Sequence, residues 1–449
     1  MTSELPLGWK QVPVIDLLES MTGGVWGNQP GMGEVDVTVA RVTEFHKSGT
    51  LNLATAATRS VTQRQAASRE LQDTDLLLEK SGGGPNTPVG RVVRVPPHKG
   101  TLIPTNFVQL LRPSLDVVDD RYLFWLLWSW HDNGRSIPFQ TATTNIRNLK
   151  TRDYLSQLAP VPQLPEQKRI VAAIEEQFSR LDAAEVALWS AERRIRALEK
   201  SVITEASSTL TPPPHWKIAF VADAGTVGLG LQRSPKRHNG PNMRPYLRVA
   251  NVFEDRIDDS DVMSMDMTEA EWERYRLRDG DVLLNEGQSP ELLGRPAIYR
   301  GKPPNIAFTN SLIRFRAKKD IDPEWALLVF RSHMHNRRFM RESQITTNIA
   351  HLSAGRFKTV EFPVPPLDEQ QARVADARVG LVGCARLRAE VAAARRRSTN
   401  LRRSLLAAAF SGRLVPQDRD QEQAEGLLER TQRERAAGPM VKEGTVKAS

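Results

Sequence analysis

The chain has 449 residues, of which 40% are hydrophobic, and a formal net charge of +9. This length is enough for about three domains with buried cores, and the basic excess modestly favours a polyanionic partner. One cysteine excludes a disulfide framework and favours an intracellular setting, and we expect neither a signal peptide nor a membrane span.

Residues 1–159 are predicted to form a first globular domain of mixed strands and helices. Alternating apolar and polar residues predict a strand at 35–45. Short apolar runs bounded by Gly and Pro predict further strands at 76–78, 92–95 and 107–111. The aromatic-rich segment Tyr122–Trp130 is expected to be structural, as part of a helical hairpin or as buried core.

The glycine-rich loop 81–90, SGGGPNTPVG, is a weak candidate for a phosphate cradle. It lacks the Gly-Lys-Ser/Thr ending of a P-loop and the spacing of a dinucleotide fingerprint. A tight turn between strands, near DNA, fits this segment better.

The stretch 160–207 opens PVPQLPEQ and is predicted to form a first long helix. Pro165 suits the first helical turn, where its missing N–H costs nothing. Apolar residues recur every seven positions, and a second row follows three residues later, which predicts a coiled-coil seam. The first row is Ile174, Leu181, Leu188, Ile195 and Val202, and the second row is Ala184, Ala191 and Leu198.

Residues 208–362 are predicted to form a second globular domain, entered through the stiff TPPP linker at 211–214. The basic loop 228–240, GLGLQRSPKRHNG, suits contact with phosphates, and an ordinary solvated loop is the alternative. Strands are predicted at 246–252 and within 280–299, and a helix at 325–339.

Residues 363–416 open PVPPLDEQ and are predicted to form a second long helix, with Gly412 as its C-terminal cap. Its first apolar row is Cys384, Val391, Ser398 and Leu405, and its second row is Leu387, Ala394 and Leu401. Seven arginines form either a solvated face or a contact for phosphates or an acidic partner: Arg386, Arg388, Arg395, Arg396, Arg397, Arg402 and Arg403. The charged tail 417–449 holds a candidate short helix at 425–437.

The two halves of the chain repeat one another well beyond the long helices. PVPQLPEQ at Pro160 recurs as PVPPLDEQ at Pro363, 203 positions later. Four further pairs match: LGWK at Leu7 with PHWK at Pro214, TDLLLEK at Thr74 with GDVLLNE at Gly280, TNFVQLLR at Thr105 with TNSLIRFR at Thr309, and TTNIRNL at Thr143 with TTNIAHL at Thr346. The sequence therefore predicts a duplicated unit of globular domain plus long helix.

The sequence lacks the motifs of methyltransferases, of nucleases and of metal sites. It has no Asn-Pro-Pro-Tyr or Asp-Pro-Pro-Tyr motif for amino methylation and no glycine signature for adenosylmethionine. Glu79, Lys80 and Glu286 do not have the spacing of a nuclease core, and the histidines do not have the spacing of metal ligands. We therefore expect a chain without catalytic activity.

These features resemble the specificity subunit of a Type I restriction-modification system. The resemblance covers nearly all of 1–416 and is carried by the duplicated layout, by YLRVANV, GDVLLNEGQSPELLGR and TTNI-x-x-L, and by the ending AFSGRLVP. It implies an α+β fold: two similar mixed α/β target-recognition domains, separated by two long helices that form an antiparallel coiled coil, with a pseudo-twofold internal repeat. The family varies with its DNA target where 11–70 and 218–276 differ, which suggests unequal half-sites.

The resemblance also implies a function. This chain would be a non-catalytic, cytoplasmic reader of double-stranded DNA, with each domain recognising one half of a bipartite target. The helices would set the spacing and dock two methyltransferase subunits, restriction subunits would join through the complex, and no membrane would be involved. The chain itself would need no cofactor, because S-adenosylmethionine, ATP and Mg²⁺ would be used by partner subunits. The alternatives are a DNA-binding regulator or recognition subunit that serves another effector, and a coiled-coil protein scaffold.

Candidate DNA contacts follow from side-chain chemistry, since Arg suits guanine edges, Gln and Asn suit adenine, and Lys suits phosphate. The candidates are Arg91 and Asn145 in the first domain, and Arg233, Lys236, Arg237, Gln288 and Arg295 in the second. Arg91 and Arg295 are placed alike in the two halves, so support of the fold is the alternative role for both.

Overall fold

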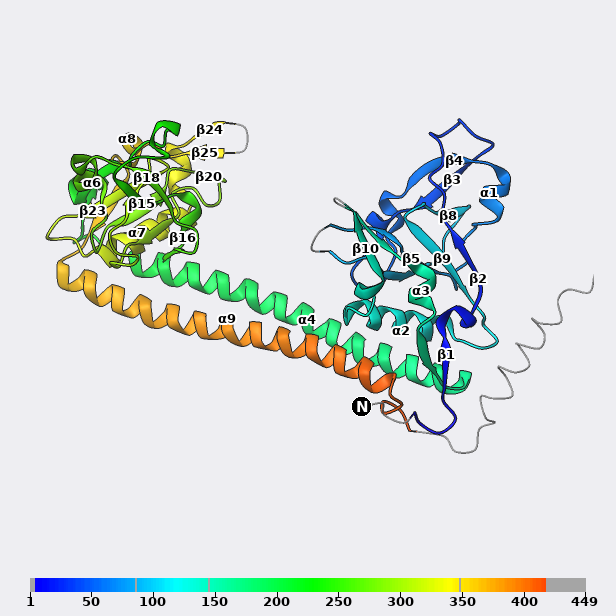
Figure 1. Cartoon of the computed structure of the whole chain (residues 1–449). Coiled ribbons are helices and arrows are strands. Elements are labelled where there is room, and N and C mark those ends of the chain that lie inside the picture. The colour runs from blue at the N-terminus through cyan, green and yellow to red at the C-terminus, as the bar shows by residue number, and fades with distance from the viewer. Residues whose placement is uncertain (1–4, 85–86, 144–145, 347–348, 417–449) are drawn as a thin grey trace, which may run out of the picture. The chain divides into compact units, whose positions relative to one another are not determined.

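The computed structural model describes residues 5–84, 87–143, 146–346 and 349–416. The chain divides into two compact units (Figure 1). Unit 1 comprises Met1–Glu185 and Arg395–Ser449, and unit 2 comprises Val186–Ala394. The long helices α4 (Leu164–Ser207) and α9 (Leu367–Ala409) each contribute to both units. None of the helices in the described ranges is long and apolar enough to cross a bilayer.

Unit 1 is built from four small sheets. Their strand orders are β2-β9-β5-β7, β4-β3-β8, β10-β11-β6 and β1-β12, and within them only the pairing of β3 with β8 is parallel among the described strands. The strands are β1 Lys10–Pro13, β2 Leu18–Gly23, β3 Val35–Ala40, β4 Ala57–Val61, β5 Leu76–Glu79, β6 Ser81–Gly82, β7 Val92–Arg94, β8 Leu102–Pro104, β9 Val108–Pro113, β10 Gln140–Thr143, β11 Ile146–Leu149 and β12 Leu158–Val161. The short helices are α1 Gln63–Ala67, α2 Asp120–Asp132 and α3 Thr151–Leu155.

Unit 2 repeats these sheets in the same order. Its strand orders are β14-β23-β19-β21, β18-β15-β22, β20-β25-β24 and β13-β26, and β15 pairs with β22 in parallel. The strands are β13 Lys217–Phe220, β14 Gly225–Leu229, β15 Met243–Leu247, β18 Met263–Asp266, β19 Val282–Asn285, β20 Gly287–Gln288, β21 Pro296–Ile298, β22 Ala307–Phe308, β23 Leu312–Ala317, β24 Gln344–Thr346, β25 Ile349–His351 and β26 Glu361–Val364. The helices are α5 Val221–Ala224, α6 Glu269–Tyr275, α7 Pro323–His335 and α8 Ala354–Phe357, and a hairpin of β16 Val252–Phe253 with β17 Arg256–Ile257 is added. The matching orders agree with the duplication predicted from the sequence.

The long helices begin later than the sequence motif predicted. Leu158–Val161 forms β12, which pairs with β1, and Glu361–Val364 forms β26, which pairs with β13. The prolines in PVPQLP and PVPPL keep the residues before them extended, which favours a strand over a first helical turn. Helices α4 and α9 therefore start at Leu164 and Leu367 instead of at the opening prolines.

Other predicted elements differ in detail. The strand predicted at 35–45 ends at Ala40 and is followed by a 3-10 turn, and the strand predicted at 246–252 begins at Met243 and ends at Leu247. The segment Tyr122–Trp130 lies within α2, whose apolar side chains belong to the core of unit 1. The helix predicted at 325–339 corresponds to α7, and Arg338–Glu342 forms a separate 3-10 helix.

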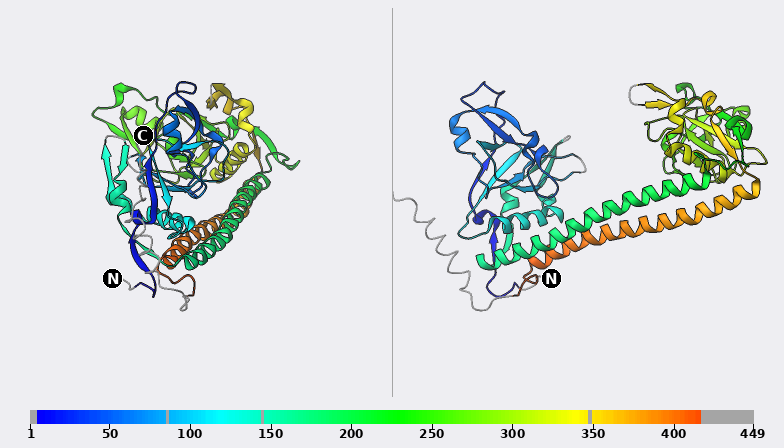
Figure 2. Two further views of the ribbon diagram at one scale, coloured as in Figure 1. Left: turned by 90° about the vertical axis from the view of Figure 1, so that its right-hand side faces the viewer. Right: turned by 180° about the vertical axis from the view of Figure 1, so that it is seen from behind.

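In each unit, a segment of α4 lies beside a segment of α9 that runs in the opposite direction (Figure 2). The first predicted row lies in this contact: Ile195 is 6% exposed and Cys384 is 1% exposed. The second predicted row is wrong. Leu198, Leu387 and Leu401 are all about half exposed.

Charged residues occupy the second row of the helix contact. They lie four residues after the first-row positions, at Glu185 and Glu199 on α4 and at Arg388, Arg395 and Arg402 on α9. In unit 1, Arg395 Nε lies 3.1 Å from Glu185 Oε1, and in unit 2 Arg388 pairs with Glu199. Four of the seven arginines singled out in the sequence thus bind acids of this chain, because Arg402 and Arg403 pair with Asp182 and Asp132. These ion pairs explain the four arginines without a solvated face and without an external phosphate or acidic partner.

A buried glutamine joins each globular domain to its long helix. In unit 2, Gln370 is fully buried; its Nε2 donates to Asp320 O at 3.0 Å and to Pro365 O at 2.9 Å, and its Oε1 accepts from Asp322 N at 2.9 Å. Asp322 is the N-cap of α7, so this one side chain connects α7, the strand exit and α9. Gln167 makes the same three kinds of contact in unit 1.

The residue before each glutamine completes the joint. Trp9 Nε1 donates to Glu166 Oε1 at 3.1 Å, and Trp216 Nε1 donates to Glu369 at 3.1 Å. The duplicated motifs LGWK/PHWK and LPEQ/LDEQ are therefore the two sides of one contact.

We predict that Gln370→Leu lowers the free energy of unfolding of unit 2 by roughly 2–4 kcal/mol, because it leaves one buried and two part-buried backbone groups without this partner. Gln371→Leu is the matched control, since Gln371 is exposed on the same helix and its replacement should change stability by less than about 0.5 kcal/mol. Denaturant unfolding of the two variants measures the difference. Equal midpoints would show that Gln370 does not hold the joint.

Candidate nucleic-acid interface

The basic loop of unit 2 leaves β14 through an anchored glycine. A Cβ on Gly230 would lie 2.2 Å from the carbonyl oxygen of Phe308, so only glycine fits without a shift. Leu231 N then donates to Phe308 O at 3.0 Å, and Asn310 N donates to Leu231 O at 3.1 Å. The loop therefore starts from a fixed position on the sheet.

Arg237 fixes the far side of this loop. Its Nη1 and Nη2 donate to Glu271 of α6 at 2.9 and 2.7 Å, and Nη1 also donates to Asp266 O at 3.2 Å. These hydrogen bonds lower the pKa of Glu271 to about 2. Arg237 thus holds the loop against α6, and the Glu271 carboxylate largely balances the charge of Arg237.

Two predicted contacts are displayed by the braced loop. Arg233 and Lys236 are both exposed, and the Arg233 guanidinium lies 5.9 Å from the centre of the Tyr246 ring. Lys236 sits in a 3-10 turn, Pro235–Arg237, and its backbone N–H donates to the Ser234 hydroxyl at 3.4 Å. Neither cation forms an ion pair with a carboxylate in the parts of the chain that the structure describes, so both charges face solvent.

Arg91 and Arg295 occupy matching places but have different surroundings. Arg91 Nε and Nη2 donate to Glu79 at 2.8 and 2.9 Å, and Glu79 is buried at the end of β5. Asn285 stands at the matching end of β19, and its amide oxygen, when turned toward Arg295, accepts from Nε and Nη2 at 3.3 Å. The Arg295 guanidinium also lies 4.7 Å from the Phe253 ring centre, and burial lowers its pKa.

These contacts favour a fold-supporting role for Arg91. Arg295 is held without a carboxylate hydrogen bond, so more of its charge remains available. Gln288 lies half-buried in β20, where its Oε1 accepts from Ser289 N at 3.1 Å. Asn145 lies outside the described residues.

Sequence reasoning missed the loop of unit 1 that matches the basic loop. Gly24 follows β2 as Gly230 follows β14, and a Cβ on Gly24 would lie 2.1 Å from Thr105 O. The loop displays Trp26, which is 52% exposed and stands beside Arg59. Transferring the loop 228–240 through the repeat would have indicated this segment, although it carries no basic residue of its own.

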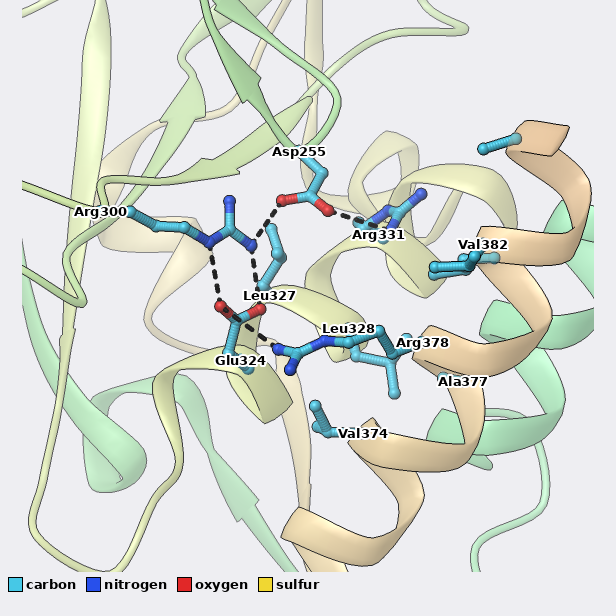
Figure 3. Close-up of a pocket in the computed structure, with 12 residues that line it drawn as sticks. Asp255, Arg300, Glu324, Leu327, Leu328, Arg331, Val374, Ala377, Arg378 and Val382 are labelled. Carbon is cyan, nitrogen blue, oxygen red and sulfur yellow. Dashed lines mark hydrogen bonds and ion pairs between the residues drawn. The ribbon is translucent and has the colours of Figure 1, made fainter. Parts of the chain in front are cut away.

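A hollow of about 240 Å³ lies between α7 and α9 in unit 2 (Figure 3). Its floor is apolar, from Leu327, Leu328 and Val374 among others. The charged groups at its rim are mutually paired: Arg300 Nη2 lies 3.0 Å from both Asp255 and Glu324. With its cations already neutralised, this hollow is not suited to hold a phosphate.

Comparison with known proteins identifies the architecture. Residues 233–375 match the family model "Type I restriction modification DNA specificity domain". The EcoKI specificity subunit of the Type I restriction enzyme from Escherichia coli strain K12 is 26% identical over 317 residues, which cover 66% of this chain and 68% of that protein. The StySPI specificity subunit from Salmonella potsdam is 23% identical over 462 aligned residues, which cover 96% of each. The chain is therefore similar to specificity subunits of Type I restriction enzymes, in sequence over most of its length and in the matched domain of its second half.

Solved structures share the fold of this chain. One chain from a structure of complex assembly and conformational transition of the type I R-M system has a TM-score of 0.71 and 17% identity, covering 91% of this chain and 99% of that chain. The HsdS subunit from Thermoanaerobacter tengcongensis has a TM-score of 0.52 and 17% identity, covering 92% of this chain and 99% of that chain. The α+β fold with two long helices predicted from the sequence is confirmed.

We predict that Lys236→Ala weakens DNA binding by this chain and makes the salt dependence shallower by about one unit of slope, because one phosphate contact is lost. The fold should be unchanged, since the Lys236 side chain is exposed. Lys217→Ala on β13 is the control, because it removes one exposed charge away from the loop. A slope identical in both variants and the parent chain would remove Lys236 from the contacts.

Proposed function

We propose that this chain is the DNA-recognition subunit of a Type I restriction-modification enzyme and that each unit reads one half of a bipartite target. The observation that carries the proposal is the duplicated fold, in which equivalent loops leave equivalent anchored glycines but display different side chains. Two readers on one chain bind DNA more tightly than either alone, because the second binding event is intramolecular. Different loop side chains on the same fold would let the two units recognise unequal half-sites.

The outer surface of the long helices is proposed to dock two methyltransferase subunits. In unit 2, large apolar side chains of α4 and α9 remain about half exposed or more: Val186, Trp189, Leu198, Val379, Val382 and Leu387. Exposed apolar side chains gathered on helices are typical of protein-binding surfaces. The apolar hollow between α7 and α9 borders this surface through Val382 (Figure 3).

The chemistry is proposed to reside in the partners. S-adenosylmethionine would bind the methyltransferase subunits, and ATP and Mg²⁺ would be used by restriction subunits that join through the complex. This chain would supply sequence recognition and positions for its partners. Support comes from the relatives, which are named specificity subunits, and from the sequence, which lacks methyltransferase and nuclease motifs.

Two measurements test this proposal. Co-expression with the neighbouring methyltransferase should yield a complex, and methylation mapping of DNA from those cells should reveal one two-part motif. The complex should also bind DNA with a steep salt dependence. A chain that binds DNA but no methyltransferase would be a regulator, and a chain that binds no DNA would be a scaffold.

We predict that the purified chain alone neither methylates nor cleaves DNA. The physical reason is the absence from the sequence of motifs that bind the methyl donor or form a nuclease core. Radiolabelled methyl transfer and plasmid cleavage measure the two activities, with the methyltransferase complex as the positive control. Turnover that copurifies with the isolated chain through successive columns would overturn this prediction.

We predict that deleting one heptad from each long helix, residues 181–187 and 384–390, shortens the recognised gap by roughly three base pairs. Seven helical residues rise about 10 Å, and B-DNA rises about 3.4 Å per base pair. Both rows of the helix contact survive, because its charged positions recur every seven residues, at Glu185, Glu192 and Glu199 and at Arg388, Arg395 and Arg402.

Methylation mapping of the deletion variant measures the gap directly. Each half-sequence should be unchanged, whereas a four-residue deletion in each helix should break both rows and unfold the contact. A folded heptad variant that still methylates the original spacing would show that the helices do not set it.

A further inference from the structure

Trp26 of unit 1 is a large aromatic side chain that stays half exposed, and the packing of the fold does not explain why it is exposed. Trp26 is 52% exposed, although indole rings bury large apolar areas and dominate cores and interfaces. We propose that Trp26 is a DNA contact of unit 1, in which the indole stacks against a base at an unstacked step of the duplex while Arg59 and Lys80 bind neighbouring phosphates. This inference rests on the proposed DNA-reading function and deepens it.

The backbone on both sides of Trp26 is fixed. Before it, Gly24 N donates to Val108 O at 3.1 Å and Val25 N donates to Pro104 O at 3.0 Å. After it, Gly27 has a φ of +74°, a conformation that favours glycine, and Asn28 N donates to Ser60 O at 2.8 Å. The indole is therefore presented from a short arch that is tied to the sheet at both ends.

The ring contacts two side chains of unit 1 and leaves about half of its surface exposed. Its centre lies 6.2 Å from that of Phe107 in an edge-to-face arrangement with an interplanar angle of 87°. The Arg59 guanidinium lies 5.4 Å from the ring centre. A pre-positioned ring loses little conformational freedom on binding, which favours stacking.

Two cations accompany the indole. Lys80 Nζ lies 3.3 Å from the place where a Cβ of Gly23 would be, at the foot of the arch. Within the described ranges, neither Arg59 nor Lys80 forms an ion pair with a carboxylate, in contrast to Arg91. An aromatic face next to available cations is the chemistry by which proteins bind nucleic-acid strands.

The duplicated frame points to DNA instead of a protein partner. The matching loop of unit 2, after Gly230, displays Gln232, Arg233 and Lys236, all exposed, where unit 1 displays Trp26. A protein partner shared by both units would need similar surfaces there. Two different half-sites would need different surfaces. Base stacking in unit 1 and polar contacts in unit 2 would be such a difference.

The test uses the full chain in complex with its methyltransferase and a DNA fragment that this complex methylates. Trp26→Ala should weaken binding by about 5- to 150-fold, the range expected for one lost base stack. Trp26→Phe should recover part of the loss, because phenylalanine keeps an aromatic face. Arg59→Gln should reduce the salt slope by about one.

Phe220→Ala is the matched control, since Phe220 is 53% exposed on β13 of unit 2. This variant should bind DNA as tightly as the parent chain does. Scrambling one half-site should abolish the effect of Trp26→Ala, and scrambling the other should preserve it. Thermal unfolding of each variant checks the fold. If Trp26→Ala does not fold, Trp26→Phe and Arg59→Gln decide the question.

Variants that fold and match the parent chain in affinity and salt slope would overturn the role of Trp26. That result would leave the proposed function intact. Failure of the parent complex to bind DNA at all would instead contradict the proposed function.

Discussion

The structure depends on one buried polar joint that occurs twice. Gln167 and Gln370 each bridge a helix N-cap, a strand exit and the start of a long helix, and a tryptophan ties the beginning of the domain to the preceding glutamate. A buried amide with all its partners satisfied fixes direction as well as contact, because hydrogen bonds are directional and costly to leave unmade. Each globular domain is thereby set on its own long helix in one orientation.

In the contact between α4 and α9, ion pairs add direction as the buried hydrogen bonds do at the joint. An apolar row alone would tolerate sliding of one helix along the other by a heptad, since apolar contacts are not directional. Pairs such as Arg388 with Glu199 and Arg395 with Glu185 add an acid opposite an arginine in each unit. Interhelical ion pairs contribute modestly to stability but help to select orientation and partner.

Much of the architecture could be predicted because duplication and apolar periodicity are visible in residue letters. The long helices and strands such as β5 follow from such patterns. The second row of the helix contact could not be predicted in this way, because apolar periodicity is blind to a row made of Glu and Arg. The sequence analysis does not predict β12, because it assigns PVPQLP to the start of the helix, whereas the prolines favour extended backbone there.

The candidate site was predictable only where charge revealed it. Lys236 and Arg233 stand in a visibly basic loop and are displayed by the structure. Trp26 gave no such signal, because its cations come from distant positions, Arg59 and Lys80, that only the fold brings near. Arg237 and Arg91 show a second limit of the sequence, since it does not reveal that these arginines are bound by Glu271 and Glu79.

The way the chain is shared between the units has a consequence for its synthesis. Unit 2 is one continuous stretch, Val186–Ala394, whereas the core of unit 1 includes Leu406 and Ala409, far from its other members in the sequence. Phe410 also packs edge-to-face on Tyr122, with ring centres 5.4 Å apart. Domains on a ribosome generally fold as units as they emerge, the N-terminal one first. In this chain the first domain gains the last members of its core, from the final turns of α9, only after the whole of unit 2 has been translated.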